Sequence, residues 1–175
     1  AITIGSPEKK ETYLGPVVSA RAEKTILDYM EIGKKEGRLV SGGAKHSSPG
    51  FFLQPTVYAD VKSDARIAQE EIFGPVLAVI PVGSFEEALA VANGTIYGLT
   101  GAYYSRDRAK IVEAKRRLHV GNLYINRKCT GALVGIHPPI DRHQVVAGRQ
   151  ALDCEALLEP LLSGAVLREN DHPLV

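Results

Sequence analysis

The feature that most constrains the fold is an alternation between amphipathic helical segments and short apolar runs. Apolar residues recur every three or four positions in the helical segments, whereas the runs between them are short, often β-branched, and bounded by glycine or proline. The predicted helices cover 20–36, 84–92 and a stretch from Ser105 or Asp107 to about Leu118, and the predicted strands cover 39–40, 51–57, 75–82, 99–104 and 123–126. Strands that alternate with helices of ten or more residues indicate βαβ units. The predicted fold class is therefore α/β, a mostly parallel sheet with flanking helices.

Several local signals define the ends of these helices. Ser19 is a candidate N-cap for the first helix, and Ser84 with Glu87 forms a capping-box pattern before the second. Gly33 lies inside the first helix, where glycine costs roughly 1 kcal/mol relative to alanine. We expect Gly37 to end that helix in the left-handed conformation that glycine adopts readily.

Two of the predicted strands carry expectations about their position in the sheet. Pro55 interrupts 51–57, so this segment is expected at a sheet edge or at a bulge. The run 75–82 is apolar and β-branched throughout, which predicts a strand covered on both faces. Between them, residues 65–71 are long enough for one or two helical turns.

Length and charge exclude several classes of function. The chain has 175 residues, which suits one domain or a piece of a larger one, and its formal net charge is +1. That charge gives no general electrostatic reason to bind nucleic acid or an anionic membrane. No apolar run approaches the roughly 20 residues that span a bilayer, and the first residues show no signal-peptide pattern. The two cysteines form no disulfide framework, so we expect a reducing, cytoplasmic location.

Candidate nucleophiles and metal ligands are sparse. Cys129 follows Lys128, a neighbour that favours a reactive thiolate. A lone cysteine at a strand end nevertheless packs more often than it reacts. The five histidines show no metal-ligand spacing, so no metal site is predicted. The sequence also lacks both common glycine-rich phosphate-binding patterns, and thus a dinucleotide fingerprint of its own.

Two segments remain as candidate sites. In 69–76, the paired carboxylates of Glu70 and Glu71 are followed by the aromatic Phe73 and a Gly-Pro turn. A carboxylate there can hold ribose hydroxyls by two charge-assisted hydrogen bonds, although a plain helix end and turn is the simpler interpretation. In 126–135, small residues follow two cations, so backbone N–H groups can face an anion. The simpler interpretation of that segment is a loop that requires glycine.

These two segments also carry a family resemblance. Residues 70–75 (Glu-Glu-Ile-Phe-Gly-Pro) strongly resemble a hallmark of the NAD(P)-dependent aldehyde dehydrogenase superfamily. Several spaced motifs in the family's order support the resemblance, namely Gly15-Pro16-Val17, Phe52 with Pro55-Thr56-Val57, Ala92-Asn93, Tyr97-Gly98-Leu99-Thr100, Val120-Gly121-Asn122 and Asn126. The resemblance covers residues 1–138, and implies part of the catalytic domain.

The segment 126–135 narrows the resemblance to one branch. It is similar to the pyrroline-5-carboxylate (glutamate semialdehyde) dehydrogenases, which oxidise that aldehyde to glutamate. The resemblance implies that the backbone N–H groups of Gly131 and Ala132 bind the substrate's α-carboxylate. It also implies that Glu71 binds the nicotinamide ribose and that Phe73 packs near the nicotinamide ring. The implied cofactor is NAD, with NADP as the alternative.

The same resemblance places the catalytic groups outside this chain. The family's nucleophilic cysteine, its general-base glutamate and its Rossmann-like domain all precede the segment that begins at Ala1, so Cys129 is not the nucleophile. We therefore expect no catalytic residue in this chain and no dehydrogenase activity from the chain alone. The parent enzyme is expected to be a homo-oligomer that acts on a small aldehyde, with no nucleic-acid or membrane partner.

The last part of the chain, 139–175, shows no family resemblance. After His137-Pro138 the family's next aromatic is missing, and a Leu-rich stretch from Cys154 to Leu167 is the one candidate helix. We expect a divergent tail there, separate from the partial catalytic domain of 1–138. Two alternatives stay open: an aldehyde dehydrogenase for another aldehyde, and a non-catalytic module that binds a partner through the tail.

Overall fold

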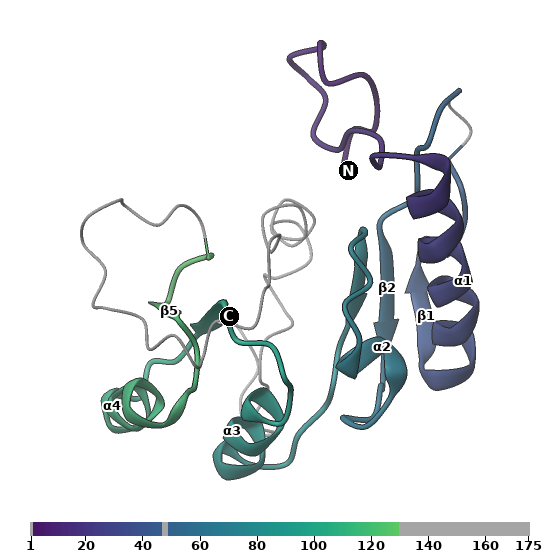
Figure 1. Cartoon of the computed structure of the whole chain (residues 1–175). Coiled ribbons are helices and arrows are strands. Elements are labelled where there is room, and N and C mark those ends of the chain that lie inside the picture. The colour runs from purple at the N-terminus through teal and green to yellow at the C-terminus, as the bar shows by residue number, and fades with distance from the viewer. Residues whose placement is uncertain (1, 47–48, 130–175) are drawn as a thin grey trace. The chain divides into compact units, whose positions relative to one another are not determined.

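The computed structural model describes residues 2–46 and 49–129, which fall into two compact units (Figure 1). The first unit ends at Pro81 and the second begins at Val82. The first contains α1 (Ala20–Glu36), β1 (Arg38–Ser41), β2 (Thr56–Ala59), α2 (Arg66–Gln69) and β3 (Val76–Ala78). The second contains α3 (Phe85–Asn93), β4 (Thr100–Tyr103), α4 (Arg108–Arg117) and β5 (Asn122–Ile125). The predicted tail, 139–175, lies outside the described residues.

The first unit is a three-stranded sheet with α1 along one face (Figure 1). The strand order is β1-β2-β3; β1 pairs antiparallel with β2, and β2 pairs parallel with β3. Two buried clusters lie between helix and sheet: Ile26, Met30 and Leu53 form one, and Tyr58, Val61 and Ile67 form the other. The α/β class with mainly parallel pairing is confirmed.

The predicted bounds of α1 match the observed helix. The Ser19 hydroxyl accepts a hydrogen bond from the Ala22 N–H at 3.2 Å, as an N-cap does. Ile26 and Met30 are four residues apart and lie on one face, where both are almost fully buried. The helix is therefore specified locally by its cap and its apolar stripe.

Two glycines near the C-terminal end of α1 have a steric role that the sequence did not indicate. A Cβ at Gly33 would lie 2.6 Å from the ring of Tyr58, so this glycine permits close helix–sheet packing that alanine would obstruct. Gly37 ends the helix as predicted, but its backbone is extended (φ −158°) and not in the left-handed conformation. A Cβ there would lie 2.7 Å from a methyl carbon of Val61, so steric space accounts for this glycine as well.

The predicted edge position of the strand near Pro55 and the predicted burial of 75–82 on both faces are wrong. The ladder of β1 with β2 does contain an irregularity, between Leu39 and Ser41 of β1 and not at Pro55. The strand after Pro55 begins at Thr56, extends to Ala59, and occupies the centre of the sheet instead of an edge. Pro55 is tolerated because it precedes the ladder, in which the Thr56 N–H donates to the Pro75 carbonyl at 2.8 Å. The run 75–82 yields a strand of three residues, Val76–Ala78, all half-buried and not covered on both faces.

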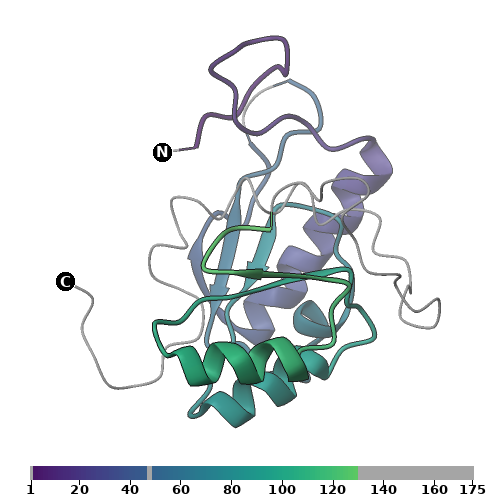
Figure 2. The ribbon, with the colours of Figure 1, turned by 90° about the vertical axis from the view of Figure 1, so that its left-hand side faces the viewer.

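The second unit contains the βαβ unit that the alternation predicts. Strands β4 and β5 are parallel and are joined by α4, which Asp107 caps through hydrogen bonds from the Ala109 and Lys110 N–H groups at 2.8 and 3.2 Å. Helices α3 and α4 lie side by side (Figure 2). Arg117 of α4 joins them through a bidentate ion pair with Glu86 of α3 at 2.9 and 2.6 Å.

The capping box before α3 is confirmed with one difference. The Ser84 hydroxyl accepts from the Glu87 N–H at 3.1 Å, while the Glu87 carboxylate accepts from the N–H of Gly83, the residue before the cap, at 2.7 Å. Within the part of the chain that the structure describes, no helix is both long and apolar enough to cross a membrane.

Candidate functional site

The loop between α2 and β3 alternates between anchored and exposed side chains. Glu70 and Ile72 are half-buried, whereas Glu71 and Phe73 are exposed. Ile72 packs against both buried clusters of the first unit. This alternation leaves one carboxylate and one aromatic ring, two residues apart, facing outward on the same short segment.

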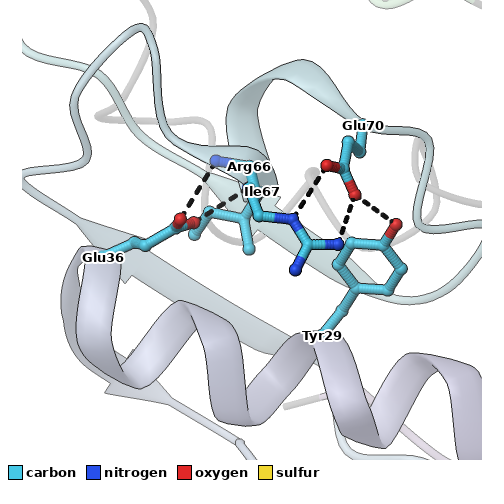
Figure 3. A network of polar contacts seen from close by, with 5 residues as sticks. All are labelled: Tyr29, Glu36, Arg66, Ile67 and Glu70. Atoms are coloured by element: carbon cyan, nitrogen blue, oxygen red, sulfur yellow. Dashed lines mark hydrogen bonds and ion pairs between the residues drawn. The ribbon is translucent and has the colours of Figure 1, made fainter.

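Glu70 is held by two elements of the first unit (Figure 3). Arg66 donates to both of its carboxylate oxygens at 2.8 Å, and the Tyr29 hydroxyl donates to one of them at 2.6 Å. These hydrogen bonds, those from Arg66 first, lower the pKa of Glu70 from its ordinary value of 4.5 to about 2. The bond from Tyr29 raises the pKa of that phenol above its ordinary 10.0. The first carboxylate of the pair is thus a structural anchor.

The far end of the loop is fixed by packing. A Cβ on Gly74 would lie 2.6 Å from Ile26, so the loop backbone contacts the buried face of α1 directly. The Pro75 carbonyl then accepts a hydrogen bond from the Thr56 N–H, and this bond connects the end of the loop to β2. Because both ends are fixed, the exposed side chains between them project from a rigid support.

The backbone of Phe73 lies in the left-handed region, with φ of +61°. A non-glycine residue there carries strain of roughly 1 kcal/mol or more, and such strain is concentrated at functional sites. Nearly half of the Phe73 side chain, 49%, is exposed, so core packing alone does not account for the conformation. No hydrogen bond or ion pair within residues 2–46 and 49–129 engages the Glu71 carboxylate. Both groups are therefore available to an external ligand.

The depressed pKa of Glu70 predicts a specific dependence of stability on pH. The pKa of Glu70 is lower in the folded state than in the unfolded state. Its contribution to the free energy of unfolding is therefore complete above about pH 4.5 and is lost as the pH falls toward 2. In urea unfolding of the chain, wild type should be more stable than Glu70→Gln at neutral pH. This difference in the free energy of unfolding should decrease as the pH falls from about 4.5 to about 2. Glu71→Gln is the matched control and should show little difference from wild type throughout; a Glu70→Gln difference that persists unchanged to pH 2 would contradict the prediction.

The second candidate segment begins where β5 ends. Asn126 has φ of +54°, and its side chain accepts from the Ser105 N–H at 2.8 Å and donates to the Ser105 carbonyl at 2.9 Å. Its own N–H donates to the Tyr103 carbonyl at 3.0 Å. Asn126 therefore fixes the carboxyl ends of the parallel strands β4 and β5 together. Ligands of α/β proteins commonly bind at such an edge. Gly131 and Ala132, the predicted substrate residues, lie outside the described residues.

Cys129 and the described histidines belong to no recognisable metal site. Cys129 is a thiol of intermediate exposure. Among the described residues, no group of three or more His, Cys, Asp and Glu side chains is placed to hold a metal ion.

The contributions of Tyr29, Glu36 and Arg66 were not predicted from the sequence. The four-residue spacing of Arg66 and Glu70 is a recognisable helical ion-pair signal. Tyr29, in contrast, lies 41 residues from Glu70 in the sequence, and Glu36 lies 30 residues from Arg66. No local pattern connects residues at such distances, so these contacts required the tertiary structure.

Comparisons with known proteins agree with this geometry. The model of the aldehyde dehydrogenase family matches residues 1–139. The 1-pyrroline-5-carboxylate dehydrogenase 1 of Halalkalibacterium halodurans is 56% identical over 137 residues, which are 78% of this chain and 27% of that protein. The chain thus spans about a quarter of the length of the curated relatives it matches.

Solved structures of pyrroline-5-carboxylate dehydrogenases and related proteins are also similar to this chain. A 1-pyrroline-5-carboxylate dehydrogenase from Thermus with bound NAD is 58% identical, with a TM-score of 0.75 over 78% of this chain and 26% of that one. Proline utilization A from Bdellovibrio bacteriovorus is 45% identical, with a TM-score of 0.74 over 78% of this chain and 14% of that one. The resemblance to one family over residues 1–138 is confirmed, because the family match ends one residue later. This chain belongs to the aldehyde dehydrogenase family.

Proposed function

We propose that this chain is part of an NAD-dependent dehydrogenase that oxidises glutamate semialdehyde, the open form of pyrroline-5-carboxylate, to glutamate. The observation that carries the proposal is the difference in similarity within the family. The Thermus pyrroline-5-carboxylate dehydrogenase is 58% identical to this chain, whereas an indole-3-acetaldehyde dehydrogenase and a betaine aldehyde dehydrogenase are each 36% identical. The identity falls from 58% to 36% between enzymes named for this substrate and those named for other aldehydes, which favours a shared substrate.

Glu71 and Phe73 are the residues of the described chain that would bind the cofactor. The chemistry of the loop fits NAD: an exposed carboxylate accepts hydrogen bonds from vicinal ribose hydroxyls, and an exposed ring offers an apolar surface to the nicotinamide. NAD, when bound, supplies the hydride acceptor of the reaction. The strained backbone of Phe73 supports a ligand-binding role, since it keeps the ring exposed. NADP is the alternative cofactor.

Gly131 and Ala132 are proposed to bind the α-carboxylate of the substrate through their backbone N–H groups. Backbone N–H groups of small residues form anion-binding concavities of this kind. Asn126 supports the assignment, because it determines where the segment leaves the paired ends of β4 and β5.

The remaining parts of the proposal concern the whole protein. We propose that the parent enzyme is a cytoplasmic homo-oligomer that takes a small aldehyde and has no nucleic-acid or membrane partner. Residues 1–138 would form part of its catalytic domain, with 139–175 a separate tail. No residue of this chain is assigned as the catalytic nucleophile or general base. The 175-residue polypeptide on its own is therefore expected to form no NADH from glutamate semialdehyde.

A chimera tests the proposal directly. The 137 matched residues of the Halalkalibacterium halodurans enzyme are replaced by those of this chain, and NADH formation is measured with glutamate semialdehyde and with an uncharged aliphatic aldehyde. We expect activity of the same order as the unaltered relative, with its preference for the amino-acid aldehyde retained. A folded chimera that forms no NADH would overturn the proposal. Equal efficiency with both aldehydes would favour an enzyme for another aldehyde.

A further inference from the structure

Helix α1 contacts α2 through two polar side chains, Tyr29 and Glu36, that are seven positions apart (Figure 3). Residues at this spacing lie on the same face of a helix, two turns from each other. The Tyr29 hydroxyl donates to Glu70, the residue directly after α2, at 2.6 Å. The Glu36 carboxylate accepts hydrogen bonds at the N-terminal end of α2. The short helix is thus held at both ends by one longer helix.

Glu36 supplies the N-terminal cap that α2 lacks in its own sequence. Ala65 occupies the cap position and makes no side-chain hydrogen bond. The Glu36 carboxylate accepts instead from the Arg66 N–H at 3.1 Å and the Ile67 N–H at 3.0 Å. An acidic residue is unfavourable at the C-terminal end of its own helix but favourable at the N-terminus of another. The location of Glu36 is therefore explained by its contact with α2.

Tyr29 makes two contacts with this end of the molecule. The Arg66–Glu70 ion pair lies within α2 and its end, while the Arg66 guanidinium lies over the Tyr29 ring, 5.7 Å from its centroid, a contact that does not need the hydroxyl. The hydrogen bond from Tyr29 crosses from α1 to the start of the loop. Because Glu71 follows Glu70 directly, the position of the Glu70 backbone determines where the Glu71 side chain begins.

We propose that Tyr29 and Glu36 are positioning residues for cofactor binding, which hold α2 on α1 so that Glu71 and Phe73 face the cofactor. This inference rests on the proposed function. Neither residue touches the cofactor in this assignment. Both act through Glu70 and the first turn of α2, and the buried contact of Gly74 with Ile26 holds the far end of the same loop.

Tyr29→Phe is the decisive variant, and Tyr58→Phe is its matched control. Both substitutions remove one hydroxyl that donates at 2.6 Å, Tyr29 to the Glu70 carboxylate and Tyr58 to the Met30 carbonyl of α1. The Tyr58 bond is buried and joins β2 to Met30 of α1 without involving a residue of 66–76, so its loss should affect stability but not cofactor affinity. The two variants therefore separate a positioning role from a general structural one.

In the chimera, Tyr29→Phe should raise the KM for NAD by roughly threefold to tenfold. This is less than the full effect of a lost hydrogen bond to a charged group, because Tyr29 acts on Glu71 only through Glu70. The KM for the aldehyde should stay within about twofold of wild type, and Tyr58→Phe should leave both KM values unchanged. Equal effects of Tyr29→Phe and Tyr58→Phe on the KM for NAD would overturn the inference. A wild-type chimera without activity would instead refute the proposed function.

Hydrogen exchange in the 175-residue chain tests the positioning without any cofactor. Tyr29→Phe should accelerate amide exchange across 66–76 by roughly threefold or more, whereas Tyr58→Phe should not do so selectively. Unchanged exchange in that segment would overturn the inference even if the chimera is inactive. Faster exchange together with an unchanged KM for NAD would show that the contact is structural only, which also overturns it.

Discussion

Replacing Gly42 with alanine should lower the free energy of unfolding of the first unit by about 2–5 kcal/mol. Gly42 has φ of +74°, a conformation that costs other L-residues roughly 1–2 kcal/mol. A Cβ built there would also lie 2.1 Å from the Pro55 carbonyl oxygen, a backbone atom that cannot rotate away. Overpacking of this kind adds roughly 1–3 kcal/mol. Strain and overpacking act in the same direction, which makes this the largest stability effect we expect.

We expect Gly42→Ala to weaken a hydrogen bond at the start of the central strand β2 as well. The next residue, Gly43, donates its N–H to the Thr56 hydroxyl at 2.9 Å, and Thr56 is 1% exposed at the start of β2. A displaced turn would weaken this bond and leave a buried hydroxyl poorly paired. Urea unfolding of the chain, followed by circular dichroism, measures the effect as a lower midpoint.

Gly15→Ala is the matched control for this substitution. A Cβ on Gly15 meets no atom within 4 Å, and its φ is not in the positive range. Its free energy of unfolding should stay within about 0.5 kcal/mol of wild type. Equal midpoints for Gly42→Ala and Gly15→Ala would show that the turn adapts at no cost, contrary to the structure.

Replacing Glu71 with alanine should raise the KM of the chimera for NAD by roughly tenfold to a hundredfold. Hydrogen bonds to a charged group contribute roughly 1.5–3 kcal/mol, and about 1.4 kcal/mol corresponds to a factor of ten. The free energy of unfolding should change little, because the Glu71 side chain is exposed and has no partner among the described residues. Cofactor titrations and urea unfolding of the same variant measure the two quantities.

The neighbouring Glu70→Gln provides the contrast. Glu70 binds Arg66 and Tyr29, so its substitution should lower stability directly and affect the KM for NAD only through the position of the loop. The two adjacent glutamates are thus expected to have different roles: Glu71 binds the cofactor and Glu70 fixes the loop. A Glu71→Ala variant with an unchanged KM for NAD would remove Glu71 from the proposed cofactor site.

Local patterns were sufficient where the determining interactions are local. The bounds of α1 follow from the Ser19 cap and from apolar residues at helical spacing, all within a few residues of one another. The motif 70–75 likewise indicated the family and the proposed cofactor loop from six adjacent residues. The structure adds that Glu71 and Phe73 are its exposed members.

Patterns were insufficient where a residue's environment comes from distant segments. The run 75–82 predicted a long covered strand, but only Val76–Ala78 pairs with β2 as a strand. Pro55 predicted a sheet edge or a bulge, because the sequence does not show that the ladder begins one residue later. Gly33 is an unfavourable residue for a helix when only the sequence is considered, but the structure shows that the ring of Tyr58 packs against it.

The sequence by itself therefore determined the α/β class, the helices, the family and the segment that carries the candidate cofactor site. These properties depend on spacing and on short motifs, which are visible along the chain. The tertiary structure alone decided which glutamate is anchored, which has no partner among the described residues, and which residues of α1 hold the loop in place. Tyr29 and Glu36 acquire their partners only when α1 packs beside α2, because a contact across 30 or 41 residues has no local signature.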